Sequence, residues 1–108
     1  MNTNSYETIY IMKPNLGDNQ VTQTINRYKN ILKKYGGWNI LIQHRGRRHL
    51  SYYIQNYYDG IYIQMNYSSN PHLITLLEDF MRLDNKICRY LTIRQNQLYK
   101  NKAKSLLN

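Results

Sequence analysis

Residues 59–94, DGIYIQMNYSSNPHLITLLEDFMRLDNKICRYLTIR, decide the fold because their side-chain pattern changes from strand to helix and back to strand. Apolar and polar side chains alternate from residue 61 to residue 67, which is the period of a strand with one apolar face. Asn70 and Pro71 indicate a helix start, since proline at the first helical position removes an N–H that has no partner there. Apolar side chains then recur at helical spacing, at Leu73, Leu76, Leu77, Phe80 and Leu83.

This helix is expected to end at Asp84-Asn85, and the renewed alternation over residues 87–94 predicts a last strand. The chain ahead of residue 59 follows the same plan. Residues 6–12 are rich in β-branched and aromatic side chains and predict a first strand, which residues 14–17 break.

A first helix is expected next, with Asp18 or Asn19 as its N-cap. Its apolar stripe consists of Val21, Ile25, Tyr28, Leu32 and Tyr35, which places both tyrosines in the core. Gly36-Gly37 ends this helix. A second strand opens at residues 38–43 and is expected to continue through the arginines toward Ile54, before a turn at residues 56–60.

The order is therefore βαββαβ, which predicts an α+β, ferredoxin-like sandwich with a four-stranded antiparallel sheet and two helices on one face. The residues expected beneath the helices are Ile9, Ile11, Ile40, Ile42, Ile61, Ile63, Leu91 and Ile93. The opposite face is expected to carry Tyr10, Tyr62 and Tyr90 and to have no helix over it. The predicted domain covers residues 1–95, and the basic residues 96–108 are expected to form a loose tail.

Charge points to an anionic partner. Fifteen Lys and Arg against six Asp and Glu give a net charge of +9, and the sequence pI is 9.7. Such an excess in a 108-residue chain favours a polyanion as partner. The single cysteine, Cys88, excludes an internal disulfide, and no apolar run approaches the roughly 18 residues of a membrane span. The first ten residues resemble neither a signal peptide nor a transit peptide.

Catalysis and metal binding find no support in the sequence. The six acidic residues fall in caps, turns and separate elements, and do not form the paired carboxylates of acid–base chemistry. The three histidines and Cys88 lack the paired spacing of a zinc site, and no phosphate-binding glycine loop is present. The sequence therefore predicts no enzyme, no metal and no cofactor.

The arginine stretch HRGRRHLSYYI, residues 44–54, is the main candidate for function. Guanidinium groups match phosphate oxygens and stack on bases, and tyrosine rings stack on unpaired bases. A solvated loop is the competing interpretation of this stretch. Further basic residues near the last strand favour RNA, namely Arg82, Lys86, Arg89 and Arg94. The lysines of the first helix, Lys29, Lys33 and Lys34, are interpreted as its solvent side.

Several motifs resemble the small-subunit ribosomal protein six family of bacteria and plastids, over about residues 5–95 and most closely its cyanobacterial–plastid branch. They are Tyr6-Glu7, Tyr35-Gly36-Gly37, the run Gly46, Arg48, Leu50 and Tyr52, then Asp59-Gly60-Ile61-Tyr62 and Arg89-Tyr90-Leu91-Thr92-Ile93. The resemblance implies a ferredoxin-like fold, no catalysis, and a structural role in the small ribosomal subunit.

By this resemblance, the partners are the central domain of the small-subunit rRNA and ribosomal protein eighteen, with no membrane and no small-molecule substrate. The expected RNA- or partner-binding residues are Arg45, Arg47, Arg48, Tyr52, Arg89 and Arg94. A plastid (chloroplast) ribosome is the expected location, with the bacterial cytoplasm as the alternative. The competing hypothesis is a non-ribosomal interaction module or a small enzyme on the same fold, because this fold hosts many functions.

Overall fold

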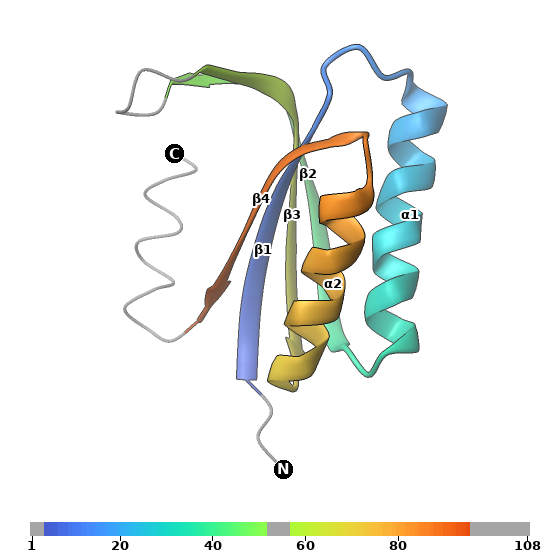
Figure 1. Ribbon diagram of the computed structural model, residues 1–108, viewed down its shortest axis with the longest axis vertical. Coiled ribbons are helices and arrows are strands. Elements are labelled where there is room, and N and C mark those ends of the chain that lie inside the picture. Colours follow the sequence, from blue (N-terminus) through green and yellow to red (C-terminus); the bar gives the residue numbers. More distant parts are fainter. Residues whose placement is uncertain (1–3, 52–56, 96–108) are drawn as a thin grey trace.

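The computed structural model describes residues 4–51 and 57–95, and its elements have the predicted order βαββαβ. They are β1 (Asn4–Met12), α1 (Asp18–Lys34), β2 (Trp38–Ser51), β3 (Tyr57–Ser69), α2 (Pro71–Leu83) and β4 (Ile87–Arg94). All strand pairs are antiparallel, in the sheet order β2-β3-β1-β4. Both helices lie on one face of the sheet, α1 in contact with β2 and α2 with β4 (Figure 1). The predicted ferredoxin-like fold class is confirmed; the predicted tail at residues 96–108 lies outside the described residues.

Local signals set the helix ends. At α2, the Asn70 side chain accepts a hydrogen bond from the Leu73 N–H at 3.3 Å, as expected of an N-cap ahead of Pro71. At α1 the predicted N-cap was wrong by one residue, because Asp18 is already helical and Gly17 is the cap. The Gly17 N–H instead donates to the Gln20 side chain at 3.2 Å. The acidic Asp18 then lies in the first turn, where it complements the helix dipole.

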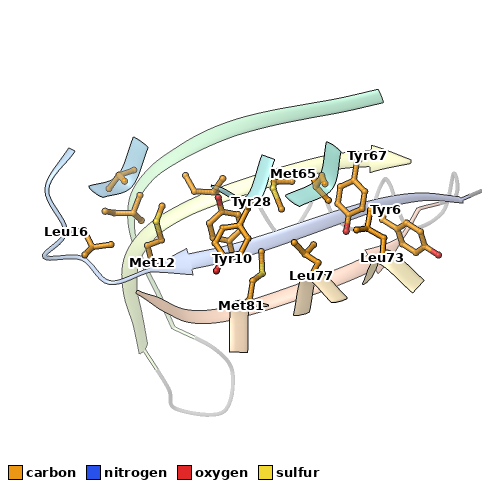
Figure 2. Close-up of a cluster of buried hydrophobic side chains, with 14 residues drawn as sticks. Tyr6, Tyr10, Met12, Leu16, Tyr28, Met65, Tyr67, Leu73, Leu77 and Met81 are labelled. Atoms are coloured by element: carbon orange, nitrogen blue, oxygen red, sulfur yellow. The ribbon is translucent and has the colours of Figure 1, made fainter. Parts of the chain in front are cut away.

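The core differs from the prediction in the faces of β1 and β4. Tyr10 is fully buried on the helix side, with its ring 5.3 Å from that of Tyr28 (Figure 2). Tyr90 packs against the same core. Ile9, Ile11, Leu91 and Ile93 consequently belong to the opposite face, which we call the open face. Both alternating sets of these strands contain large apolar side chains, so alternation did not decide which set was inside. The larger tyrosine rings fill the space beneath the helices.

The faces of β2 and β3 match the prediction. Ile61 and Ile63 are buried in the core, and Ile40 and Ile42 pack against it. Tyr62 lies on the open face as expected, but it is only 2% exposed and therefore offers no free ring. Two residues of the helical stripes were wrongly predicted to be buried: Tyr35 is 40% exposed and Leu83 is 80% exposed, and each stands at the C-terminal end of its helix.

β2 and β3 are much longer than the other two strands. They span 14 and 13 residues, whereas β1 has 9 and β4 has 8. The ends of β2 and β3 therefore extend beyond the body of the sheet and bend away from the helix layer (Figure 1). The projecting part of β2 includes the last described residues of the arginine stretch, up to Ser51. Its expected continuation to Ile54 lies outside the described residues.

Candidate nucleic-acid interface

A β-bulge interrupts the arginine stretch of β2. His44 pairs with Ile63 and Gly46 with Tyr62, so Arg45 is an extra residue without a Cα partner in β3. Gly46 has a φ of 85°, a left-handed conformation that glycine adopts without steric penalty. The Gly46 N–H donates to His44 Nδ1 at 3.0 Å, which closes the bulge.

The bulge divides the three arginines between the two faces of the sheet. Arg48 pairs with Gly60 and Arg47 with Ile61, whose side chain is part of the core. Arg47 therefore lies on the helix side, whereas Arg45 and Arg48 lie on the open face. In a regular strand, Arg45 and Arg47 would have shared a face instead.

Arg47 is bound to the connection between β1 and α1. Its Nη1 donates to the Pro14 carbonyl oxygen, and its Nη2 donates to the Leu16 carbonyl oxygen at 3.2 Å. Because a guanidinium is a planar fork, it satisfies two neighbouring carbonyls at once. This arginine thus joins β2 to a loop 31 to 33 residues earlier in the chain.

Arg45 is held over the open face by two glutamines. Its Nε and Nη2 donate to Gln64 Oε1 at 3.1 and 2.8 Å, and Nη2 also donates to Gln43 Oε1 at 3.1 Å. Arg48 follows on the same side, with its Nε donating to the Arg45 carbonyl oxygen at 3.1 Å. The two guanidinium groups on this side therefore lie one after the other along an edge strand.

A buried carboxylate, that of Glu7, holds the glutamine to which Arg45 is bound. Glu7 is 3% exposed, and its Oε1 accepts hydrogen bonds from Gln64 Nε2 at 2.8 Å and Asn66 Nδ2 at 3.3 Å. Gln95 Nε2 donates to the same oxygen at 3.4 Å. Gln64 consequently donates to the carboxylate while its carbonyl oxygen receives Arg45. The other oxygen, Glu7 Oε2, is buried and has no hydrogen-bond partner within residues 4–51 and 57–95.

Sequence reasoning missed these polar residues of the open face. The signal was present in β3, where Gln64 and Asn66 alternate with apolar residues of the core, and in the only acidic residue of β1, Glu7. The open face was expected to be partly aromatic, with Tyr62 and Gln64 on β3; at its centre the structure shows an amide and carboxylate network, which was not expected.

The remaining candidates lie apart from this pair. Arg89 pairs with Ile11 on the open face, but on β4, the opposite edge of the sheet. Three strand spacings separate the two edges, or about 14 Å. Arg94 pairs with Tyr6 at the far end of β4 and is exposed. Tyr52 lies outside the described residues. The structure thus brings Arg45 and Arg48 together and leaves the other candidates at separate places.

Charge is distributed unevenly over the two halves of the fold. Between Asp18 and Asp59 the chain contains no Asp or Glu, and seven Lys and Arg: Arg27, Lys29, Lys33, Lys34, Arg45, Arg47 and Arg48. This segment contains most of α1 and all of β2, which contact each other. Three of the six acids lie instead on or directly after α2, where Asp79 pairs with Arg82 at 2.9 Å. One flank of the molecule, α1 with β2, therefore carries seven basic residues and no acidic residue after Asp18.

Other kinds of site find no support in the described part of the chain. It holds no group of three metal-ligating side chains from His, Cys, Asp and Glu. It also holds no helix long and apolar enough to cross a membrane.

Comparison with known proteins gives one consistent result. Residues 5–94 match the family model described as Ribosomal protein S6. The small ribosomal subunit protein bS6c of the red alga Gracilaria tenuistipitata var. liui is 53% identical over 87% of this chain and 91% of its own. The small ribosomal subunit protein bS6 of the cyanobacterium Trichodesmium erythraeum is 47% identical over 88% of this chain and 81% of its own. The crystal structure of 30S ribosomal protein S6 from Thermotoga maritima superposes with a TM-score of 0.79 at 25% identity, covering 97% of this chain and 99% of that one.

The fold, the basic flank and these relatives define a structural protein of the small ribosomal subunit, a class without enzymatic activity. The chain belongs to the ribosomal protein S6 family. The resemblance drawn from the sequence motifs is thereby confirmed, and the competing hypothesis of a non-ribosomal module or small enzyme is set aside.

Proposed function

We propose that this small-subunit ribosomal protein binds the central domain of the small-subunit rRNA, together with ribosomal protein eighteen, in a plastid ribosome. The observation that carries the RNA-binding part is the bulge at Arg45-Gly46, which places Arg45 and Arg48 on one side of an edge strand in a segment without acidic residues. The plastid assignment is supported by the red-algal relative, which at 53% identity exceeds the cyanobacterial one at 47%.

Arg45 suits phosphate binding because its geometry is set before RNA arrives. Two of its donors already bind Gln43 and Gln64, and the buried Glu7 network fixes Gln64 in turn. An immobilised side chain loses less entropy on binding, which is worth about 0.5–1.5 kcal/mol per residue. Arg47 contributes indirectly, because its bonds to the β1–α1 connection hold the projecting part of β2 in place.

The open face is the proposed surface for ribosomal protein eighteen. No described helix covers it, and Leu41 on β2 and Leu91 on β4 are 56% and 52% exposed at its two edges. Apolar contact with these leucines and a basic partner side chain toward Glu7 would suit the polar centre and apolar rims of this face.

The decisive experiment measures binding to a central-domain rRNA fragment over a range of salt concentrations, with and without ribosomal protein eighteen. Replacing both Arg45 and Arg48 by alanine should weaken binding and flatten the dependence of log affinity on log salt by about 1.4 to 1.8, for two phosphates. Arg82→Ala is the matched control, because Arg82 is an exposed arginine on α2 that pairs with Asp79. An unchanged salt slope in the double variant would refute the assignment of these arginines to phosphate.

A sucrose-gradient profile of the source material tests the broader proposal. The chain should sediment with the small ribosomal subunit and remain there at moderate salt. Its recovery only in the top fractions would contradict a role as a resident ribosomal protein.

A further inference from the structure

The side chains of the open face form rows that cross the four strands. One row consists of Leu41, Asn66, Glu7 and Ile93, since each of these residues is the Cα partner of the next. Glu7 is the one acidic residue in β1, β2 and β4. The open face therefore has a single carboxylate near its middle, with an apolar residue at each end of the same row.

The centre of this face is withdrawn from water. Glu7 and Ile11 are 3% exposed and Tyr62 is 2% exposed. Within residues 4–51 and 57–95 no helix or strand lies over them, because all strands belong to one sheet and both helices lie on its other face (Figure 1). The free face of an antiparallel sheet is normally solvated. The centre of the open face thus has the burial of a covered face.

The Glu7 carboxylate lacks a cation among the described residues. Gln64, Asn66 and Gln95 give it three neutral amide donors, all to Oε1. The nearby Arg45 is bound to glutamine oxygens, and Glu7 Oε2 is buried without a hydrogen-bond partner in residues 4–51 and 57–95. A buried carboxylate is costly unless a charge or further hydrogen bonds compensate it. Oε2 is therefore a suitable place for an ammonium or guanidinium group.

The last described residue delivers the rest of the chain to this same place. The Gln95 N–H donates to the Ser5 carbonyl oxygen at 2.7 Å, which continues the pairing of β4 with β1, and the Gln95 side chain reaches Glu7 at 3.4 Å. We call residues 96–108 the C-terminal segment. It lies beyond the family match, which ends at residue 94, and it contains no acidic residue. Its lysines are Lys100, Lys102 and Lys104, and its large apolar residues are Leu98, Tyr99, Leu106 and Leu107.

We propose that the C-terminal segment docks on the open face of its own chain, with a lysine ammonium at Glu7 Oε2 and apolar side chains against Leu91 and Ile93. Leu91 is 52% exposed and offers apolar surface beside the carboxylate. Thirteen residues span up to about 43 Å when extended, whereas the sheet is about 14 Å across, so the segment is long enough. Its attachment at Gln95 gives it an effective concentration of about a millimolar, which favours it over a free partner of the same chemistry.

Docking of this segment has a consequence for assembly. The open face is the surface assigned above to ribosomal protein eighteen, so that protein would have to displace the segment before it could bind. This consequence rests on the proposed function, whereas the docking itself does not. The C-terminal segment would then act as a competitor built into the chain.

The test of docking is a double-mutant cycle on the full chain, read from melting temperatures at low salt. One change is Glu7→Gln, and the other replaces Lys100, Lys102 and Lys104 together by glutamine. The lysine replacement should lower the melting temperature by about 4–8 °C in the wild-type background and have little further effect beside Glu7→Gln. The matched control replaces Lys29, Lys33 and Lys34 by glutamine, because it removes the same charge from α1, in the helix layer. The effect of this control should be independent of Glu7.

A labelling experiment keeps the test decisive should Glu7→Gln fold poorly. Ile93, which is partly buried in the row of Glu7, is changed to cysteine in a chain whose exposed Cys88 is replaced by serine. A thiol reagent should modify Ile93→Cys several-fold faster when the segment's three lysines are glutamines, and the α1 control should not change the rate. Affinity for ribosomal protein eighteen should rise about 5-fold with the same lysine replacement, because the competitor is weakened.

The outcomes separate this inference from the proposed function. Additive effects in the cycle together with an unchanged labelling rate overturn the docking and leave the proposed function standing. A melting temperature that rises with protein concentration shows docking on a second copy and also overturns the inference. A smaller salt slope of rRNA binding in the lysine variant, without coupling to Glu7, assigns the segment to RNA and overturns it as well. Coupling to Glu7 with unchanged affinity for ribosomal protein eighteen supports the docking and overturns the competition. If the wild-type chain binds neither the rRNA fragment nor protein eighteen, the proposed function is overturned, and the cycle still decides the docking.

Discussion

Replacing Gly46 by alanine tests whether the bulge determines the distribution of the arginines. A methyl group at Gly46 would meet no atom within 4 Å, so no clash contributes to its effect. The penalty comes from the backbone alone, because φ is 85° and an L-residue in the left-handed region is disfavoured by about 1–2 kcal/mol. For a domain of this size, 1 kcal/mol lowers the melting temperature by roughly 4–8 °C.

The structure adds a functional consequence to this loss of stability. The strain is relieved if the extra residue is expelled from the bulge, which would return Arg47 to the open face and turn Arg48 to the helix side. Gly46→Asn is the control, because asparagine tolerates the left-handed region far better than alanine. We expect thermal unfolding, followed by circular dichroism, to rank glycine above asparagine and asparagine above alanine. Affinity for the rRNA fragment should fall in the same order. Equal stability and affinity of all three chains would refute the argument that the bulge depends on this backbone conformation.

Four further perturbations follow from individual contacts. Gly60→Ala should destabilise the chain by about 3 kcal/mol or more in urea unfolding, because the new Cβ would clash with the Met12 carbonyl oxygen; an unchanged midpoint would contradict this close approach. Tyr28→Phe should lower the free energy of unfolding by about 2 kcal/mol, since Tyr28 donates at 2.6 Å to Asp84, whose side chain is 5% exposed. The same urea titration checks it, and a loss below about 0.5 kcal/mol would speak against this bond. Arg47→Ala should reduce stability by about 1 kcal/mol and leave the salt slope of RNA binding unchanged; the reverse pattern would show that Arg47 contacts phosphate. Finally, burial raises the pKa of three tyrosines, so their phenols stay protonated in the folded chain while those of the unfolded chain ionise above about pH 10. The three residues are Tyr10, Tyr28 and Tyr67. The free energy of unfolding should keep its full value below that pH and fall above it by about 4 kcal/mol per pH unit. An unfolding series at alkaline pH checks this, and an equal slope of free energy against pH for wild type and Tyr28→Phe would contradict it.

The order of the elements could be predicted from the sequence because each segment has one dominant period and a clear end. The alternation over residues 61–67 and the helical stripe beginning at Leu73 admit only one interpretation each, and Asn70-Pro71 marks the boundary between them. Given that order, the handedness of crossover connections leaves few arrangements of a four-stranded sheet. The predicted fold therefore agreed with the structure.

The faces of β1 and β4 could not be predicted in the same way. In β1 the set containing Tyr10 and the set containing Ile9 both include large apolar side chains, so the hydrophobic pattern alone did not distinguish inside from outside. The outcome depends on the volume between the sheet and two helices, which Tyr10 and Tyr28 fill together. Such complementarity is a property of three packed elements, and no single segment displays it.

The grouping of residues at the candidate site could not be predicted either, because it depends on the register of the strands. The sequence identified the arginines, but a strand without a bulge would have placed Arg45 and Arg47 together. The network beneath Arg45 was also invisible, because Glu7 and Gln64 are 57 residues apart and meet only through the pairing of β1 with β3. Residue types were therefore accessible to sequence reasoning, whereas the grouping of those residues was not.

The bulge and the buried carboxylate together explain why arginine, and not lysine, suits position 45. Its fork binds Gln64 through two nitrogens and Gln43 through one of them, and Gln64 turns its amide nitrogen to Glu7. A lysine ammonium would keep the charge, but it has no planar fork with which to bridge both glutamines in fixed geometry. The positive charge would then lose its defined position over the open face, while Glu7 would still be buried. In the proposed function, a cation held in fixed geometry on an edge strand would set the register of the protein on its RNA.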